Sequence, residues 1–240
     1  MTPDRFDDYF SNMIGQSVDG NPDQAVQVFE TSRRLQCEEG YGSVWPILIL
    51  KKAASWWVST APGLKDEIED AIQPFLAGDG FTPALIGALK NILSRQYAVK
   101  SHPHSQVFRP AMPVLEVQLP GECMLRLIRM DEKPQLVPEE SVEWGTAFGV
   151  YHSGKLASWA EVTPLPSITP RFGVMLVGIE TLPEYQRRGY ARAVLAQATR
   201  RVLAIGNIPI YHCGVQNVAS QRTALSCGYQ LYGETLRFQV

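Results

Sequence analysis

The sequence has few cysteines, and none is spaced for a metal site or a disulfide framework. Its four cysteines, at positions 37, 123, 213 and 227, form no C-x-x-C pair and have no histidine at metal-ligand spacing. The sequence therefore predicts neither a zinc site nor a disulfide scaffold, and no metal cofactor. Free cysteines commonly behave as small buried hydrophobic residues, so we expect four reduced, mostly structural thiols.

Long apolar runs and an excess of basic charge are also missing. The apolar stretch 44–50 is interrupted by Pro46 and followed by two lysines, far short of the ~20 residues of a spanning helix. The residues after Met1 lack the basic start and apolar run of a secretory signal. Lys and Arg total 22 against 24 Asp and Glu. We therefore expect a cytoplasmic protein with no membrane and no nucleic-acid partner.

The composition that is present suits a folded chain with two units. The chain has 240 residues, of which 45% are hydrophobic and 19% charged, as in ordinary globular proteins. Residues 101–113 include three prolines, which lack a backbone donor and restrain their predecessors. We interpret this segment as a linker that sustains neither a helix nor a central strand. The predicted domains are residues 1–105 and residues 106–240.

The N-terminal region has a mainly helical pattern. Apolar residues at i, i+3 and i+4 spacing indicate helices with one face on a core. Proline at the first helical position supports two of the predicted starts, and Pro74 is expected to break the last turn of the third helix. The first predicted helix begins at Asn21-Pro22 and carries Val26, Phe29 and Arg33 on one face. The second covers about 45–58, the third covers 64–75, and the fourth begins at Thr82-Pro83.

Beyond the linker the pattern changes from helical to alternating, which indicates strands. Residues 152–155 are typical of a hairpin turn between two of them. Residues 174–182 are apolar on both faces until Glu180, as expected for a buried central strand. The predicted strands are 124–130, 147–151, 156–162, 174–182 and 208–215, with helices over 192–205 and after Asn217.

A basic glycine loop, Gln-Arg-Arg-Gly-Tyr-Ala at 186–191, joins the strand 174–182 to the helix 192–205. This order aims several backbone N–H groups at one point, where the helix dipole also favours negative charge. Gly189 permits a positive φ or close backbone approach, and Arg187 and Arg188 add positive charge. The loop therefore predicts a pyrophosphate site. It is neither a P-loop nor a dinucleotide fingerprint, because the residues that define those motifs are missing.

The loop resembles the (Gln/Arg)-x-x-Gly-x-(Gly/Ala) coenzyme A motif of the GNAT superfamily of acyl-CoA N-acyltransferases. The helix that follows Asn217 and closes with Gly228-Tyr229 is similar to the family's second hallmark. The resemblance covers about 124–240, and residues 178–185 further resemble a bacterial subgroup of two-part members with a helical N-terminal region. It implies an α/β (α+β) fold: a mixed, mostly antiparallel twisted sheet with flanking helices, here preceded by the helical N-terminal region.

The resemblance also implies the function and the donor. It implies an N-acetyltransferase that moves an acetyl group from acetyl-CoA to an amine of a small molecule, amino acid, peptide or protein. Direct attack would occur in a ternary complex, with a strand N–H from Ile179–Thr181 on the carbonyl oxygen and Asn217 on the pantetheine. The coenzyme A contacts that it implies are at Ile179, Glu180, Thr181, Gln186, Arg187, Arg188, Gly189, Tyr190, Ala191, Asn217 and Ser220.

The sequence does not decide which residues are the general acid and the general base. The family's usual acid, a tyrosine in the last helix, is replaced by Ala224, so Ser226, Tyr229 or water would substitute. Glu180 and His212 are the two candidate bases. A catalytically weak coenzyme A-binding sensor is the alternative function. The N-terminal region is a candidate cover for the acceptor site, and a homodimer is one alternative for the oligomeric state.

Overall fold

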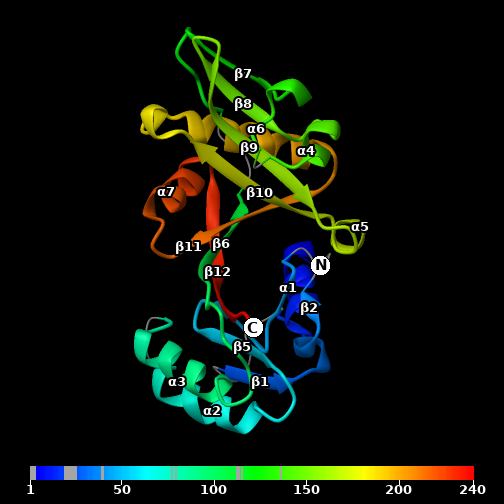
Figure 1. The fold of residues 1–240 in the computed structure, drawn as a ribbon, viewed down its shortest axis with the longest axis vertical. Helices are drawn as coiled ribbons and strands as arrows, with labels where there is room; N and C mark the ends of the chain where they lie inside the picture. Colours follow the sequence, from blue (N-terminus) through cyan, green and yellow to red (C-terminus); the bar gives the residue numbers. More distant parts are fainter. Residues whose placement is uncertain are drawn as a thin grey trace. The chain divides into compact units, whose positions relative to one another are not determined.

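The computed structural model describes residues 4–18, 26–38, 41–76, 78, 80–111, 114, 116–135 and 137–240. The chain divides into two compact units. Unit 1 comprises residues 1–106 and 232–240, and unit 2 comprises residues 107–231. Strands β6 (His104–Pro110) and β12 (Tyr229–Phe238) contribute residues to both units. Figure 1 labels helices and strands of each unit where there is room.

Unit 1 combines helices with a small sheet in the order β1-β5-β4-β12. β1 runs parallel to β5, whereas β4 pairs antiparallel with both β5 and β12. Its apolar core lies between this sheet and the helices α2 and α3. The elements are α1 (Arg5–Ile14), β1 (Val26–Glu30), η1 (Ser32–Leu35), β2 (Cys37–Glu38), β3 (Ser43–Val44), β4 (Ile47–Lys52), β5 (Ser55–Thr60), α2 (Lys65–Ile72), η2 (Gln73–Phe75) and α3 (Pro83–Leu93).

Two helices predicted for this region are wrong. Residues 45–58 form the hairpin of β4 and β5, and the residues from Val26 to Arg33 form β1 and the start of η1. An apolar run does not by itself distinguish a buried strand from a buried helix, and the β-branched and aromatic residues here suit strands. The predicted helix start at Asn21-Pro22 lies outside the described residues.

The other two helix predictions are confirmed. α2 changes to the 3-10 turn η2 at Pro74, as expected where a proline removes a helical hydrogen bond. α3 begins with Pro83 at its first position, and Thr82 Oγ1 accepts the Leu85 N–H at 3.2 Å. The N-terminal region therefore holds helices, but strands separate them.

The predicted linker is also wrong in part, because residues 104–110 form strand β6. Pro103 precedes this strand and Pro110 ends it, so the residues between them keep their backbone donors. In unit 2 the strand order is β6-β11-β10-β9-β8-β7, which places β6 beside β11.

Unit 2 is a mostly antiparallel sheet with helices on both faces. Antiparallel pairs join β7 to β8, β8 to β9 and β9 to β10, whereas β10 and β11 are parallel. The five strands predicted for this region are confirmed to within a few residues. The elements are β7 (Cys123–Leu127), η3 (Met130–Glu132), α4 (Glu139–Glu143), β8 (Phe148–His152), β9 (Lys155–Pro164), α5 (Thr169–Phe172), β10 (Val174–Thr181), η4 (Pro183–Tyr185), α6 (Tyr190–Ala204), β11 (Ile208–Gly214) and α7 (Val218–Ser226).

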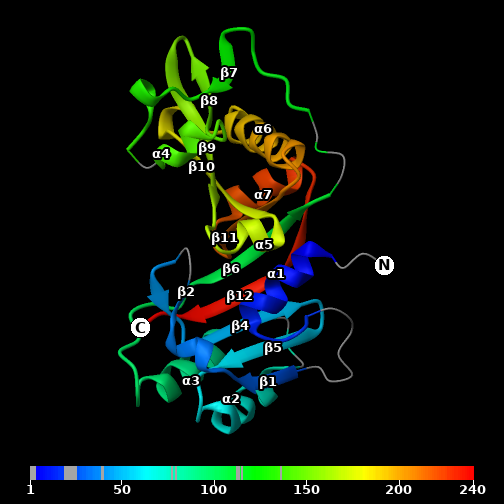
Figure 2. The same ribbon diagram turned by 90° about the vertical axis from the view of Figure 1, so that its right-hand side faces the viewer.

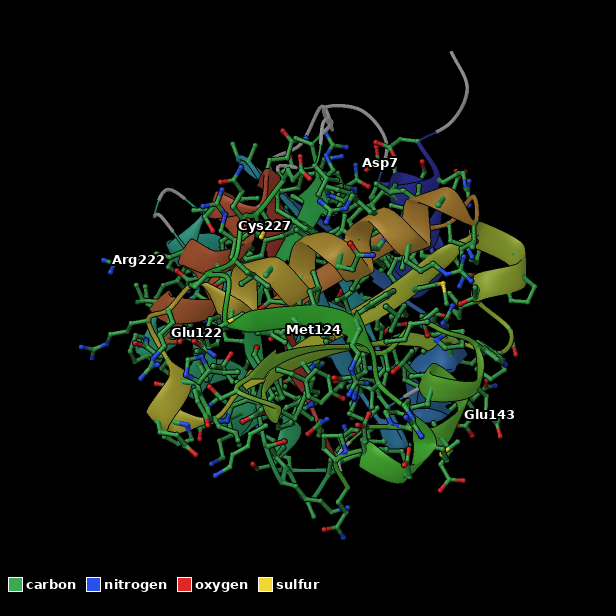
Figure 3. The ribbon with its side chains drawn as sticks, turned by 90° about the horizontal axis from the view of Figure 1, so that it is seen from above. Asp7, Glu122, Met124, Glu143, Arg222 and Cys227 are labelled. Carbon is green, nitrogen blue, oxygen red and sulfur yellow. The ribbon has the colours of Figure 1, made fainter. Side chains whose placement is uncertain are left out.

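The two faces of this sheet carry different helices. Met175 and Val177 of β10 pack in one core cluster with α6 residues such as Val194. On the other face, Trp159 of β9 packs beside Val142 of α4. Figure 2 shows α6 and α4 on opposite sides of strands β8 and β9, and Figure 3 shows the same separation from above, with Glu143 labelled at the end of α4.

The fold class predicted from the sequence is confirmed: a mixed, mostly antiparallel sheet with flanking helices follows an N-terminal region that contains helices. The division into domains 1–105 and 106–240, with the first covering the acceptor site, stays a prediction. Within the described ranges, no helix is both long and apolar enough to cross a bilayer.

Candidate functional site

The basic glycine loop leads directly into the N-terminus of α6. Gly189 is the N-cap residue, with φ of 81°, in the left-handed region that glycine adopts readily. Arg187 also has a positive φ, of 62°. The first helical hydrogen bond runs from the Ala193 N–H to the Gly189 carbonyl oxygen at 3.1 Å. The preceding N–H groups of the first turn therefore have no intrahelical acceptor and are available to a ligand.

The charge around this helix end suits an anion. Gln186, Arg187, Arg188 and Gly189 are all exposed, and the first turn of α6 contains no acidic residue. The 15-residue helix directs the positive end of its dipole at the same loop. Backbone donors, two guanidinium groups and the dipole together make a site for a phosphate-bearing ligand.

Tyr190 serves this loop through its backbone rather than its side chain. The ring is 2% exposed, and its hydroxyl lies 2.9 Å from His152 Nδ1 and 3.1 Å from Cys123 Sγ. Hydrogen bonding to Cys123, burial and the charge of Cys123 raise the pKa of Tyr190. The side chain thus anchors the start of α6 on β7 and β8, whereas the backbone N–H stays at the helix end.

The parallel strands β10 and β11 separate next to this loop. In unit 2 their pairing covers only Val174–Leu176 with Ile208–Ile210, although β10 continues to Thr181 and β11 to Gly214. β10 stays paired with β9 from Met175 to Thr181, which lies opposite Ser158. The opening therefore lies between β10 and β11, beyond Leu176 and Ile210.

Two backbone donors of β10 point into this opening. The Leu182 N–H donates to the Ala157 carbonyl oxygen at 3.0 Å, toward β9. Along an antiparallel ladder the donors alternate in direction, so the N–H groups of Ile179 and Thr181 point away from β9. Ser158 Oγ donates to the Glu180 carbonyl oxygen at 2.8 Å, which agrees with that alternation.

The helix α7 follows β11 directly in the chain. Asn217 is its N-cap, with Oδ1 accepting the Ser220 N–H at 3.1 Å, and Ser220 Oγ lies 2.8 Å from the Tyr211 hydroxyl. Ala224 is fully buried. α7 therefore has no phenol at the position where the family pattern has its tyrosine.

Neither residue suggested as a substitute acid is free to donate. Ser226 Oγ donates to the Thr223 carbonyl oxygen at 2.8 Å. The Tyr229 hydroxyl is buried against Thr199 Oγ1 at 2.6 Å, and burial raises the pKa of Tyr229 well above its usual value. Of the three substitutes predicted for the acid, this leaves water as the prediction.

These features fit coenzyme A. An added Cβ at Gly189 would meet no atom within 4 Å, so the space outside the loop is open to a ligand, while the positive φ disfavours other residues. The helix end suits the pyrophosphate, and the separated strands leave room for an extended thiol arm beside exposed backbone donors.

Comparison with known proteins agrees with this geometry. Residues 118–229 match the model of the "Acetyltransferase (GNAT) family". These residues form a GNAT acetyltransferase domain. Enzymes of this family transfer acyl groups from acetyl-CoA. No curated protein matches the sequence.

Several solved structures match part of the chain. An acetyltransferase from the GNAT family of Colwellia psychrerythraea is 14% identical with a TM-score of 0.49, and the match covers 76% of this chain and 75% of that one. A GNAT-family protein of Novosphingobium aromaticivorans is 21% identical with a TM-score of 0.45, covering 59% of this chain and 66% of its own. A Salmonella typhimurium protein, solved with its cofactor acetyl-CoA, is 12% identical with a TM-score of 0.38, covering 50% and 94%.

The two predicted bases of the GNAT domain lie on the sheet face away from α6. Val177 and Ile179 pack toward α6, so the alternating Glu180 faces the opposite side, where it is exposed near the end of β10. Tyr211 and Cys213 also pack toward α6, which places His212 on that opposite face as well. The structure thus brings both candidates to one face, and their catalytic role stays a prediction.

A third ionisable residue on this face, Glu161 of β9, was not predicted from the sequence. It is the direct cross-strand partner of Gly178 of β10. Burial raises the pKa of Glu161 to about 7, and the charge of Glu180 adds to the rise. One signal was present: a carboxylate between the apolar residues Ala160 and Val162 of a predicted strand. Its partner depends on strand register, which no local pattern gives.

Among the described residues, no group of His, Cys, Asp or Glu is arranged to hold a metal ion.

Proposed function

We propose that this chain is an acetyl-CoA-dependent N-acetyltransferase that acts on an amine of a small molecule, amino acid, peptide or protein. The observation that carries the proposal is the placement of the α6 anion site beside the opening between β10 and β11 in a GNAT domain. Acetyl-CoA supplies the acyl group as a thioester.

The residues of the loop hold the donor in this proposal. The backbone N–H groups from Gly189 to Ala191 bind the pyrophosphate, with Arg187 and Arg188 adding charge and Gln186 bordering the loop. Asn217 and Ser220 border the thiol arm from α7. Thr181 and Ile179 direct their N–H groups at the thioester oxygen, where negative charge develops during attack.

An amine acceptor suits the face away from α6. GNAT enzymes act on amine acceptors, and a protonated amine needs a group to take its proton before it can attack. Ionisable residues lie on this face, whereas the α6 face is packed with the apolar core. Attack within a ternary complex of enzyme, acetyl-CoA and amine therefore agrees with the arrangement.

The first experiment measures free thiol released from acetyl-CoA with a panel of primary alkylamines, free amino acids and short peptides. We expect at least one amine to raise thiol release above the rate without an amine, and mass spectrometry to find the acetylated amine. Binding of acetyl-CoA without release of thiol for any amine would support the coenzyme A-binding sensor instead.

A matched pair of glycine variants tests the assigned loop. Acetyl-CoA should raise the melting temperature of the wild type, because a ligand bound by the native state stabilises it. Gly189→Val should abolish this shift by blocking backbone approach to the pyrophosphate. Gly206→Val is the control, because Gly206 has a similar φ of 78° beyond the other end of α6 and should keep the shift. A full shift in the Gly189 variant would contradict the loop assignment.

A further inference from the structure

The carboxyl group of Glu161 fills the space that a side chain at position 178 would occupy. An added Cβ at Gly178 would overlap with Glu161 Oε1 and lie 2.8 Å from Cδ. Because residue 178 is a glycine, the Glu161 carboxyl group can lie directly against the backbone of β10. Glu161 Oε2 is buried and has no hydrogen-bond partner among the described residues. A buried acceptor without a donor is costly, and such groups in native proteins commonly have a functional reason.

This carboxyl group lies against β10 next to the opening. Gly178 lies two residues beyond Leu176, where pairing of β10 with β11 ends. The next residue, Ile179, directs its N–H into the same opening. We propose that Glu161 is the general base of the acetyl transfer, accepting a proton from the acceptor amine on the sheet face away from α6. This inference rests on the proposed N-acetyltransferase function.

The charged groups around Glu161 favour a carboxyl group that gains and loses its proton near neutral pH. Glu180 of β10 lies on the same face and adds to the rise in the pKa of Glu161, which burial mainly causes. By strand alternation His212 of β11 shares this face. α4 packs against β9 through Ser141 and Val142, whereas its glutamates, at 139, 140 and 143, are exposed. The cationic side chains of α6 lie on the other face of the sheet.

This environment distinguishes Glu161 from the base candidates found in the sequence. A general base works best when its pKa lies near the working pH, and the pKa of Glu161 is about 7. Glu180 is exposed to solvent. Tyr211, which faces α6, is an acid too weak to exchange protons at neutral pH, because burial raises its pKa to about 12.

The acetyl transfer forms one C–N bond, breaks one C–S bond and moves two protons from the acceptor nitrogen. The acceptor ammonium gives one proton to Glu161, and its nitrogen then forms the C–N bond to the acyl carbon. The C–S bond breaks with its electron pair on sulfur. The nitrogen loses its second proton, which reaches the thiolate through water, and Glu161 releases the first proton to solvent. The products are the amide, free coenzyme A thiol and one proton.

The test uses the full-length protein and the amine of the panel that gives most thiol. It compares wild type with Glu161→Gln and Glu161→Asp, with Glu180→Gln and His212→Gln, and with the control Glu143→Gln. We expect Glu161→Gln to lower kcat/KM by ~100-fold or more, as for a lost general base, and Glu161→Asp to recover part of the loss. Wild-type log kcat/KM should rise through an ionisation near pH 7, and this rise should be missing in Glu161→Gln. Glu143→Gln removes an exposed carboxylate of α4 from the same side of the sheet, so it should retain activity within a few-fold and keep the ionisation near pH 7. Glu180→Gln should move that ionisation to lower pH, because the charge of Glu180 adds to the rise in the pKa of Glu161.

Binding separates this proposal from the proposed function. Glu161→Gln should keep the melting-temperature shift with acetyl-CoA, because Glu161 contacts the amine rather than the donor loop. Wild-type turnover with near-normal kcat/KM in Glu161→Gln would overturn the role of Glu161 and leave N-acetyl transfer standing. A large loss only in Glu180→Gln or His212→Gln would overturn it in favour of that residue. A wild type that binds acetyl-CoA and acetylates no amine would overturn the proposed function itself.

Discussion

The ionisation of Glu161 should make the stability of the protein depend on pH in a way that one substitution removes. Burial raises the pKa of Glu161 from 4.5 to about 7, with the charge of Glu180 adding to the effect. At about 1.4 kcal/mol for each pKa unit, this rise corresponds to about 3 kcal/mol for keeping the carboxylate ionised in the folded state. Because Glu161 is partly exposed, solvent screening lowers the expected value to about 2 kcal/mol.

The sign follows from the direction of the shift. The folded-state pKa lies above the unfolded value, so the contribution of Glu161 is fully present below pH 4.5 and is lost as the pH rises through about 7. Glu161→Gln carries no ionisable group and loses nothing over that range. The free energy of unfolding of wild type minus that of the variant should therefore fall by about 2 kcal/mol between about pH 5 and about pH 8.

Urea unfolding followed by circular dichroism at the two pH values measures this difference, with the slope m as a check that both proteins unfold alike. Titration of the Glu161 carboxyl carbon by 13C NMR measures the pKa directly. Glu180→Gln is the control, since it should lower the NMR pKa of Glu161 without removing the group. An equal stability difference at both pH values, together with an NMR pKa near that of a free glutamate, would contradict a raised pKa of Glu161.

Three further predictions concern the pairing of β12, the cap of α7 and the contact of Gly178 with Glu161. A fragment of residues 106–240 should aggregate or unfold on size-exclusion chromatography, because β12 would lose its pairing with β4 and expose Leu236 and Phe238; a folded monomer would contradict this. Asn217→Ala should lower the free energy of unfolding, measured in urea, by about 1 kcal/mol because the α7 cap is lost. Asn217→Ser should retain most of that stability, and equal losses in the two variants would argue against capping. Gly178→Ala should destabilise by about 1–3 kcal/mol through overlap with Glu161, and Glu161→Ala should relieve that cost in the double variant. Additive effects of the two substitutions would show that the two residues do not contact each other.

The sequence determined the coenzyme A loop and the elements around it, because their signals are local. Gly189 adopts the positive φ for which only glycine is well suited, and a continuous apolar run before it forms the buried strand β10. Asn217 caps α7, and Thr82-Pro83 begins α3. Each of these features depends on residues within one or two turns of chain, so spacing and residue type were sufficient to predict them.

Tertiary structure decided the rest. The apolar segments at 47–52 and 55–60 are strands because they pair with each other and, in the case of 47–52, with the end of the chain near Leu236. Pairing with partners so distant in sequence leaves no local pattern. The same holds for Glu161, since only the register of β9 on β10 places its carboxyl group over Gly178. A glutamate in a strand and a glycine in another are ordinary in sequence, and their contact, with the burial that raises the pKa of Glu161, exists only in the folded sheet.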